Sequence, residues 1–273
     1  MSDVTRHYGS QGIVGRILAA VPGYSEDAFQ LSAHHFFPFD QLHGRELQAT
    51  REHAEKLAPR RDQRVLDIGS GIGGPARFLA TTYGCRVTGV DLTPEFVAAA
   101  NELSALCGLS DRVHFEHTDA SRLPFEANSF DRAICFYVGM NVRDEAGVVA
   151  EAFRVLKPGG RIVWTEATLT GKGEPVYPLP WAKDQGMSFL VAPADLRAMF
   201  QAAGFVIDEV IDESAAHVEF ARQRAASRMV STDAHQEANE LVLGQDLIER
   251  RKNYIRNLSD GTLASTLIVA HRP

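Results

Sequence analysis

Strand-like and helix-like stretches alternate through the middle of the chain. Short apolar runs such as 65–68 are typical of strands buried on both faces, while Thr93 as an N-cap and Pro94 at the first helical position indicate a helix at 94–107. The expected strands lie at 64–68, 86–90, 112–116, 130–136, 161–165, 205–211 and 263–270. The expected helices between them lie at 75–83, 94–107, 144–156 and 194–203. This alternation predicts an α/β fold, in which a parallel sheet is covered by helices on both faces.

Residues 1–60 precede the first expected strand and follow a different pattern. Apolar positions at helical spacing predict helices at 14–20 and 46–57. Between them, residues 34–43 mix aromatic, acidic and imidazole side chains around Pro38, and this mixture predicts an ordered loop.

The regular alternation also stops after the strand at 161–165. Prolines within residues 168–192 favour irregular structure there, and residues 215–257 are expected to form one or two long helices. The whole chain is therefore expected to be a single domain that carries lid insertions. Its parts are a helical N-terminal segment at 1–60, a core at 61–167, and insertions with the final strands at 168–273.

Composition narrows the class of protein. The 273 residues suit one large α/β domain, and 28 Lys and Arg against 35 Asp and Glu give a net charge of −7. A mildly acidic chain without a long basic cluster is a poor candidate for binding nucleic acid. No apolar run approaches the roughly 18 residues of a membrane span, and no signal peptide is recognisable. Three scattered cysteines, Cys85, Cys107 and Cys135, indicate reduced thiols in a cytoplasmic protein.

A glycine-rich turn follows the first expected strand of the sheet. Residues 65–74 read Val-Leu-Asp-Ile-Gly-Ser-Gly-Ile-Gly-Gly, and glycine lets a backbone approach a ligand without a side chain in the way. Pro75 then suits the first turn of a helix. Asp91 ends the second strand about twenty residues later, where a carboxylate can accept hydrogen bonds from the two hydroxyls of a ribose. The pattern predicts a nucleoside-binding site.

The order of the motifs resembles the class I S-adenosylmethionine-dependent methyltransferases, in particular the small-molecule branch of tocopherol, sterol and glycine or sarcosine methyltransferase-like enzymes. The resemblance rests on the segments 65–74, 87–91, 119–120, 123–125, 130–131 and 155–161. It implies a Rossmann-like, doubly wound sheet of seven strands whose last strand, 263–270, is antiparallel. It also implies S-adenosylmethionine as the cofactor, held by the core at 61–167, and no metal.

The resemblance assigns the methionine part of this cofactor to four residues. Gly69 and Gly71 should line it, and Asp67 should lie beneath its ammonium group. The backbone carbonyl of Phe136, at the end of the fourth strand, should face the same amino group.

The adenosine part is assigned to the ends of the second and third strands. Asp91 should hold the ribose, and Leu92 should pack on the adenine. Asp119 should accept a hydrogen bond from the adenine amino group, and the N–H of Ala120 should bond to the ring.

Two other classes of protein stay open. The spacing Gly69-x-Gly71-x-x-Gly74 with an acid downstream also matches the dinucleotide fingerprint, so an NAD(P)-dependent oxidoreductase is the alternative enzyme. Against it, Asp67 stands where such a site usually has an apolar or small residue, and Asp119 suits an adenine partner. A cofactor-binding protein without catalysis is the third class.

Methyl transfer from a sulfonium is an in-line displacement, so the protein mainly supplies alignment and excludes water. We expect a small-molecule acceptor, methylated on O, N or C, bound by residues 34–43, the strand end at 136–141 and the proline-rich segment. The oligomeric state stays open, with a homodimer among the states considered. The candidate substrate contacts are Phe39, Tyr137, Met140, Asn141, Tyr177 and Trp181.

A base is needed only if the acceptor loses a proton. Many members of the family carry a histidine after the fourth strand, where this chain has Asn141, and an amide does not titrate. The candidate catalytic residues are therefore His35 and His43 in the aromatic segment and Glu166 at the end of the fifth strand.

Overall fold

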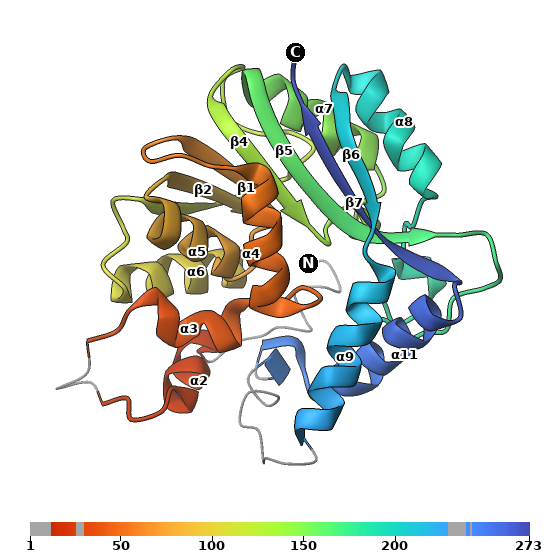
Figure 1. Ribbon diagram of the computed structural model, residues 1–273. Helices are drawn as coiled ribbons and strands as arrows, with labels where there is room; N and C mark the ends of the chain where they lie inside the picture. The colour runs from red at the N-terminus through yellow and green to blue at the C-terminus, as the bar shows by residue number, and fades with distance from the viewer. Residues whose placement is uncertain (1–11, 26–29, 229–238, 241) are drawn as a thin grey trace. The chain divides into compact units, whose positions relative to one another are not determined.

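The computed structural model describes residues 12–25, 30–228, 239–240 and 242–273. Its strands form a seven-stranded sheet in the order β3-β2-β1-β4-β5-β7-β6 (Figure 1). β7 runs antiparallel to β5 and β6, whereas β1 with β2, β2 with β3, and β4 with β5 are parallel. The predicted fold class, with its antiparallel last strand, is confirmed. The strands are β1 (Arg64–Ile68), β2 (Arg86–Asp91), β3 (Val113–His117), β4 (Phe130–Phe136), β5 (Leu156–Leu169), β6 (Val206–Asp212) and β7 (Leu263–His271).

Tertiary contacts divide the chain into two compact units. The first comprises residues 1–120 and 233–245, and the second comprises 121–232 and 246–273. The described helices of the first unit are α2 (Ile13–Ala20), α3 (Ala33–Asp40), α4 (Glu46–Leu57), α5 (Gly74–Tyr83) and α6 (Pro94–Leu106). Those of the second unit are α7 (Glu145–Val155), α8 (Pro193–Ala203), α9 (Ser214–Arg228), α11 (Leu247–Ser259) and the short 3-10 helices η1 (Gly139–Asn141) and η2 (Gln185–Met187).

The first unit is built on the parallel strands β1, β2 and β3. Val65 pairs with Val87, and Val87 pairs with Val113, so the three strands are in direct register. β1 is buried from Val65 to Ile68, as expected of a strand covered on both faces. α5 and α6, beside these strands in Figure 1, follow the first and second strands as predicted.

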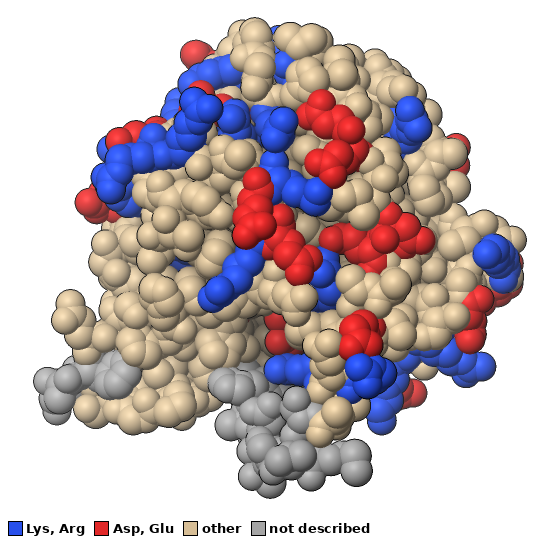
Figure 2. All heavy atoms as spheres, in the orientation of Figure 1, with Lys and Arg blue, Asp and Glu red and all other residues tan. Residues whose placement is uncertain are grey.

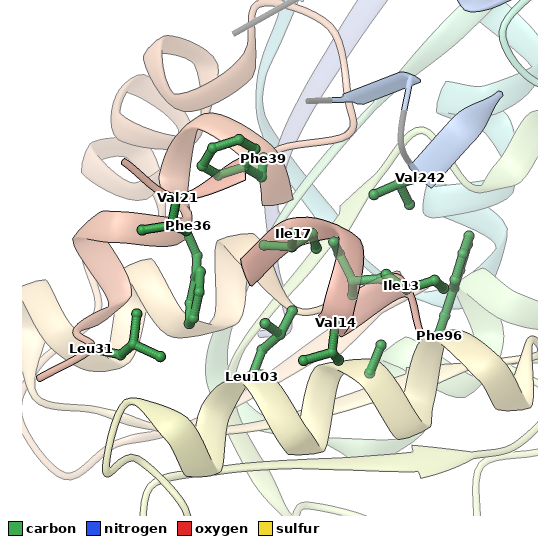
Figure 3. Packing of buried hydrophobic residues seen from close by; sticks show 12 residues of the cluster. Ile13, Val14, Ile17, Val21, Leu31, Phe36, Phe39, Phe96, Leu103 and Val242 are labelled. Atoms are coloured by element: carbon green, nitrogen blue, oxygen red, sulfur yellow. The ribbon is translucent and has the colours of Figure 1, made fainter. Parts of the chain in front are cut away.

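Residues 33–40 form the helix α3 instead of the predicted loop. The prediction was wrong because Pro38 was read as a helix breaker, although it lies inside α3. Phe36 and Phe39 of this helix are buried in a cluster that also contains residues of α2 and α6, and Figure 3 shows them close to Ile17. Burying two phenylalanine side chains contributes about 3–6 kcal/mol, which offsets the roughly 3 kcal/mol cost of an interior proline.

The second unit contains a strand, β5, that is much longer than predicted. The expected strand at 161–165 extends to Leu156–Leu169 and includes the Lys157–Gly160 stretch that was predicted to be a tight turn. Leu156 lies opposite Phe130 of β4 and Leu169 lies opposite Leu263 of β7. Between Leu156 and Arg161 the register with β4 shifts, and Gly159 has a left-handed φ of 75°, so residues 157–160 keep the local turn that was predicted although they belong to β5. Pairing between segments far apart in the sequence determines the length of β5, so the local sequence pattern does not predict it.

The helical segment predicted at 215–257 contains α9 and α11, while residues 229–238 and 241 lie outside the described part of the chain. No described helix has the length and apolar character needed to cross a membrane. All three cysteines are free thiols, as expected. Figure 2 shows basic and acidic side chains interspersed on the face drawn, without a broad field of one sign.

Candidate functional site

The glycine turn is tied to the carboxyl end of β2. Gly69 N–H donates to the carbonyl of Val90 at 2.8 Å. Gly71 N–H donates to Oδ2 of Asp91 at 2.9 Å, and Thr93 N–H donates to Oδ1 at 2.8 Å. Gly71 has a φ of 53°, a left-handed conformation that favours glycine. Each oxygen of Asp91 accepts one backbone N–H and keeps a lone pair for a ligand hydroxyl.

Asp67, two residues before the turn, carries a buried carboxyl group with an unsatisfied oxygen. The residue is 2% exposed, and its Oδ2 has no hydrogen-bond partner within the described ranges. Burial, and then the charge of Asp91, raise the pKa of Asp67 to about 8. A cationic group bound nearby would lower that pKa and satisfy the carboxylate. Asp67 therefore fits the ammonium group of the cofactor that the sequence implies.

The residues expected to hold the adenine also lie in the first unit. Leu92 follows β2 and is 67% exposed, although it is large and apolar. Its carbonyl lies 3.0 Å from Nε2 of His117, the last residue of β3. Asp119 is exposed and Ala120 is half-buried just beyond β3. These strand ends are the edge at which parallel α/β sheets bind ligands, and the exposed leucine suits a flat aromatic ring.

Tyr137 occupies a strained position at the end of β4 in the second unit, directly after the buried Phe136. Its φ of 58° is uncommon for a bulky residue, and such backbone conformations cluster at functional sites. Its hydroxyl lies 2.8 Å from Nε2 of His217 on α9 and 2.8 Å from Oγ of Ser265 on β7. Ser265 Oγ and His217 Nε2 are 3.2 Å apart, so the three groups form a closed hydrogen-bonded cluster.

Tyr254 of α11 is at the centre of an aromatic cluster around this polar group. Its ring centroid lies 6.4 Å from that of Tyr137, 5.8 Å from His217 and 5.6 Å from Trp181, all edge-on. Tyr177 packs against the same cluster. The hydroxyl of Tyr254 is buried near the Tyr137 phenol and Ser265, and burial, followed by the nearby Tyr137 phenol, raises its pKa. An apolar surface with a few buried polar groups suits a largely apolar ligand that carries a polar group.

Glu166, one of the three predicted bases, faces a second buried carboxyl group. Glu166 and Glu145 are 1% and 3% exposed. Burial raises the pKa of both, and the charge of Glu145 raises that of Glu166 further. A Cβ at Gly139 would lie 2.0 Å from Oε2 of Glu166 and 2.3 Å from Oε1 of Glu145, so both carboxyls reach the backbone of Gly139. Two buried carboxyls in such contact hold a proton between them.

The other two predicted bases have partners within the N-terminal segment. Nδ1 of His35 accepts a hydrogen bond from the N–H of Ser32 at 3.0 Å, as part of a capping box at the start of α3. Nε2 of His43 lies 2.9 Å from Oγ1 of Thr50. These contacts stabilise the segment, and the catalytic role of both histidines stays a prediction.

The remaining predicted substrate residues are distributed between the units. Phe39 belongs to the first unit and is buried in the core cluster of α2, α3 and α6. In the second unit, Met140 is buried, while Asn141 is exposed and its Nδ2 donates to the carbonyls of Tyr137 and Val138, both at 3.3 Å. The amide of Asn141 thus supports the turn after β4.

Neither His217 nor Glu145 carries a sequence signal that would have placed it near a site. His217 lies in a helix of mixed polarity, and an acid such as Glu145 is ordinary in the first turn of a helix. Among the described residues, no three His, Cys, Asp or Glu side chains are grouped to hold a metal ion.

Comparison with known proteins shows what the region that begins at the glycine turn is similar to. Residues 66–164, less than half of the chain, match the family model for a methyltransferase domain. The chloroplastic tocopherol O-methyltransferase of Arabidopsis thaliana is 36% identical over 119 residues, which cover 42% of this chain and 34% of that protein. The match to the methyltransferase domain thus spans about a third of that relative's length, and it confirms the resemblance found in the sequence.

Solved structures resemble the methyltransferase domain together with the segments around it. Geranyl diphosphate C-methyltransferase from Streptomyces coelicolor A3(2), in complex with Mg²⁺, geranyl-S-thiolodiphosphate and S-adenosyl-L-homocysteine, has a TM-score of 0.69 and 19% identity, covering 99% of this chain and 97% of that chain. The [4+2]-cyclase SpnF has a TM-score of 0.67 and 25% identity, covering 99% of this chain and 96% of that chain. The fold of the methyltransferase domain and its additions is therefore shared over nearly the whole chain.

Proposed function

We propose that this protein transfers a methyl group from S-adenosylmethionine to a small-molecule acceptor by direct displacement. The observation that carries the proposal is the buried, unsatisfied carboxyl group of Asp67 beside the glycine turn. An ammonium group bound there would satisfy it, whereas the pyrophosphate of NAD(P) would add negative charge at the same place. The site therefore favours an aminoacyl nucleoside over a dinucleotide.

The other cofactor contacts follow from the same edge of the sheet. We assign the ribose to Asp91, whose two oxygens each keep an acceptor site, and the adenine to the exposed face of Leu92. Gly69 and Gly71 would line the methionine part. The remaining proposed contacts are those of Asp119, Ala120 and the carbonyl of Phe136.

The bound cofactor would supply an electrophilic methyl group on a sulfonium. The contribution of the protein is alignment and the exclusion of water, and alignment alone is worth about 7–11 kcal/mol in well-oriented reactions. For an acceptor that loses a proton, Glu166 paired with Glu145 is the best supported of the predicted bases, because two carboxyls that share one proton keep one negative charge that can accept another. His35 and His43 are engaged in local contacts of the N-terminal segment.

We propose that the aromatic cluster around Tyr254 binds the acceptor. Tyr137, Tyr177 and Trp181 would supply apolar surface, and the buried hydroxyl of Tyr254 would bond to a polar group of the acceptor. Met140 and Asn141, in the turn after β4, are further proposed contacts. Phe39 is the least supported contact, because its ring is packed in a core.

The second candidate function is a reaction other than methyl transfer in a protein that still binds the cofactor. Its support is the similarity to the [4+2]-cyclase SpnF, which extends over 99% of this chain. The presence of Asn141, which does not titrate, in place of the histidine found in many methyltransferases is compatible with it.

Two measurements separate these functions. Thermal shift and calorimetry with S-adenosylhomocysteine and with NAD⁺, each added alone, should show binding of the first only. Transfer of labelled methyl from S-adenosylmethionine should then be followed over a panel of phenols, isoprenoid alcohols and diphosphates, and amines. Binding of NAD⁺ instead would contradict the proposal, and binding of S-adenosylhomocysteine without any labelled product would favour the second candidate.

We also propose a cytoplasmic location and a substrate that is not a nucleic acid. The free cysteines support the first and the net charge of −7 supports the second. Light scattering of the purified protein tests whether it forms a homodimer.

A further inference from the structure

A buried ion pair links the N-terminal segment to the helix that follows the glycine turn. Nη2 of Arg77, on α5, lies 2.9 Å from Oδ2 of Asp40, the last residue of α3, and neither side chain is exposed. A buried ion pair is weak support for stability by itself, because removing both charges from water costs about as much as their attraction returns. The ion pair lies beside the glycine turn, and this position points to a role other than stabilising the fold.

The same guanidinium group holds the backbone of the glycine turn. Nη2 of Arg77 also donates to the carbonyl of Ile72 at 2.7 Å, and Nη1 donates to Oγ of Ser104 on α6 at 3.2 Å. The side chain of Ile72 is buried in the cluster formed by α2, α3 and α6. The turn is thus held at Ile72 by both its carbonyl and its side chain.

The last residue of α3 and the two residues after it lie directly against this turn. A Cβ at Gly74 would fall 2.1 Å from the carbonyl oxygen of Asp40 and 2.6 Å from Nε2 of Gln41. A Cβ at Gly71 would contact Cδ1 of Leu42 at 3.6 Å. Only glycine at 74 allows the backbone of Asp40 to approach this closely, so residues 40–42 form a wall of the turn.

Asp40 is itself held by a chain of buried hydrogen bonds from α4. Nε2 of Gln41 donates to Oδ1 of Asp40 at 2.8 Å, and Oγ1 of Thr50 donates to Oε1 of Gln41 at 2.5 Å. Nε2 of His43 lies 2.9 Å from Oγ1 of Thr50. These hydrogen bonds fix the position of the Asp40 carboxylate. The ion pair with Asp40 in turn positions Arg77, which holds the glycine turn.

We propose that Asp40 and Arg77 are positioning residues for the cofactor: their ion pair couples the N-terminal segment 33–45 to the conformation of the glycine turn. The inference rests on the proposed binding of S-adenosylmethionine at this turn. Because coupling between two sites is reciprocal, cofactor binding should in turn stabilise residues 33–45. This assigns to the segment a role in cofactor binding that its sequence does not reveal.

The test compares Asp40→Asn with Glu52→Gln. Asp40→Asn keeps the size of the side chain and removes its charge, and it should weaken the binding of S-adenosylhomocysteine, measured by calorimetry, at least tenfold. Glu52→Gln is the matched control, because it breaks the ion pair with the buried Arg45, at the start of α4, without touching the turn. It should leave the affinity within about twofold, a change of about 0.4 kcal/mol. Equal affinity of Asp40→Asn and wild type would overturn the inference.

Hydrogen exchange of the wild-type protein supplies a readout that does not depend on the folding of a variant. Addition of S-adenosylhomocysteine should slow amide exchange in residues 33–45, and Asp40→Asn should lose that protection if it folds. Binding without any protection of 33–45 would overturn the coupling while leaving the proposed function intact. Failure of the wild-type protein to bind S-adenosylhomocysteine would instead overturn the proposed function.

Discussion

The carboxylate of Asp91 is the contact whose removal gives the clearest test of the cofactor site. Its oxygens accept the N–H groups of Gly71 at 2.9 Å and Thr93 at 2.8 Å, and in the proposed complex they also accept the two ribose hydroxyls. A hydrogen bond to a charged group is worth about 1.5–3 kcal/mol, so two of them amount to about 3–6 kcal/mol before water recovers a part. Asp91→Ala should therefore weaken the binding of S-adenosylhomocysteine at least tenfold, since about 1.4 kcal/mol is a factor of ten.

The assay is calorimetric titration at constant salt, with the melting temperature of each variant measured in parallel. Asp212→Ala is a matched control, because Asp212 also accepts a backbone N–H, that of Ser214 at 2.8 Å, but lies at the end of β6. It should bind with wild-type affinity, and Asp91→Asn, which keeps one acceptor oxygen, should fall between wild type and Asp91→Ala. Wild-type affinity in Asp91→Ala would refute the ribose assignment.

Two further predictions concern protons. Asp67 has a pKa raised to about 8 by burial, so it is largely protonated at neutral pH. The ammonium group of S-adenosylhomocysteine should lower that pKa and release up to about one proton, measured from binding heats in buffers of different ionisation enthalpy, and Asp67→Asn should release none. Because burial raises the pKa values of Glu145 and Glu166 above the ordinary value of 4.5, the folded protein keeps a proton that the unfolded chain loses, and the free energy of unfolding falls as the pH rises above 4.5. Glu145→Gln should therefore lose less melting temperature than wild type as the pH is raised above that value, whereas Glu151→Gln, which removes a carboxyl with a lowered pKa, should not reduce that loss. The same loss in wild type and Glu145→Gln would contradict a shared proton.

Most of the elements could be read from local pattern. The predicted helices at 46–57 and 94–107 and the strands at 64–68 and 130–136 agree with the structure to within one residue at each end. Most of their apolar residues are buried, for example Ala54 and Leu57 in the first helix and Leu103 in the second. The exceptions are segments whose conformation depends on distant partners.

The helix α3 and the length of β5 are the two elements that local pattern misjudged. Pro38 is tolerated because α3 buries Phe36 and Phe39 in a core shared with α2 and α6. β5 continues to Leu169 because β7, about a hundred residues later in the chain, offers hydrogen-bond partners along its full length. In both cases tertiary contacts override the local preference.

The residues of the candidate site differ in the same way: some could be recognised from local sequence, and others could not. The proposed cofactor residues could be named from the sequence because the glycine turn and Asp91 are tied to strand ends, and the backbone conformation there demands particular residue types. Tyr137, Tyr177 and Trp181 were named as candidate substrate contacts from the sequence, but their grouping with Tyr254 was not recognisable. The pairing of Glu145 with Glu166 was not recognisable either, because both groupings bring together residues from separate elements with ordinary local sequences.

The sequence by itself determined the α/β architecture and the position of the glycine turn, because strand and helix periods and glycine conformations are local properties. Only the tertiary structure decided that Asp40 and Arg77 meet behind that turn, that Tyr137 contacts His217, and that Glu166 is paired with a second acid. Those contacts join residues far apart in the chain. Their partners are selected by the packing of helices and strands, which no single stretch of sequence encodes.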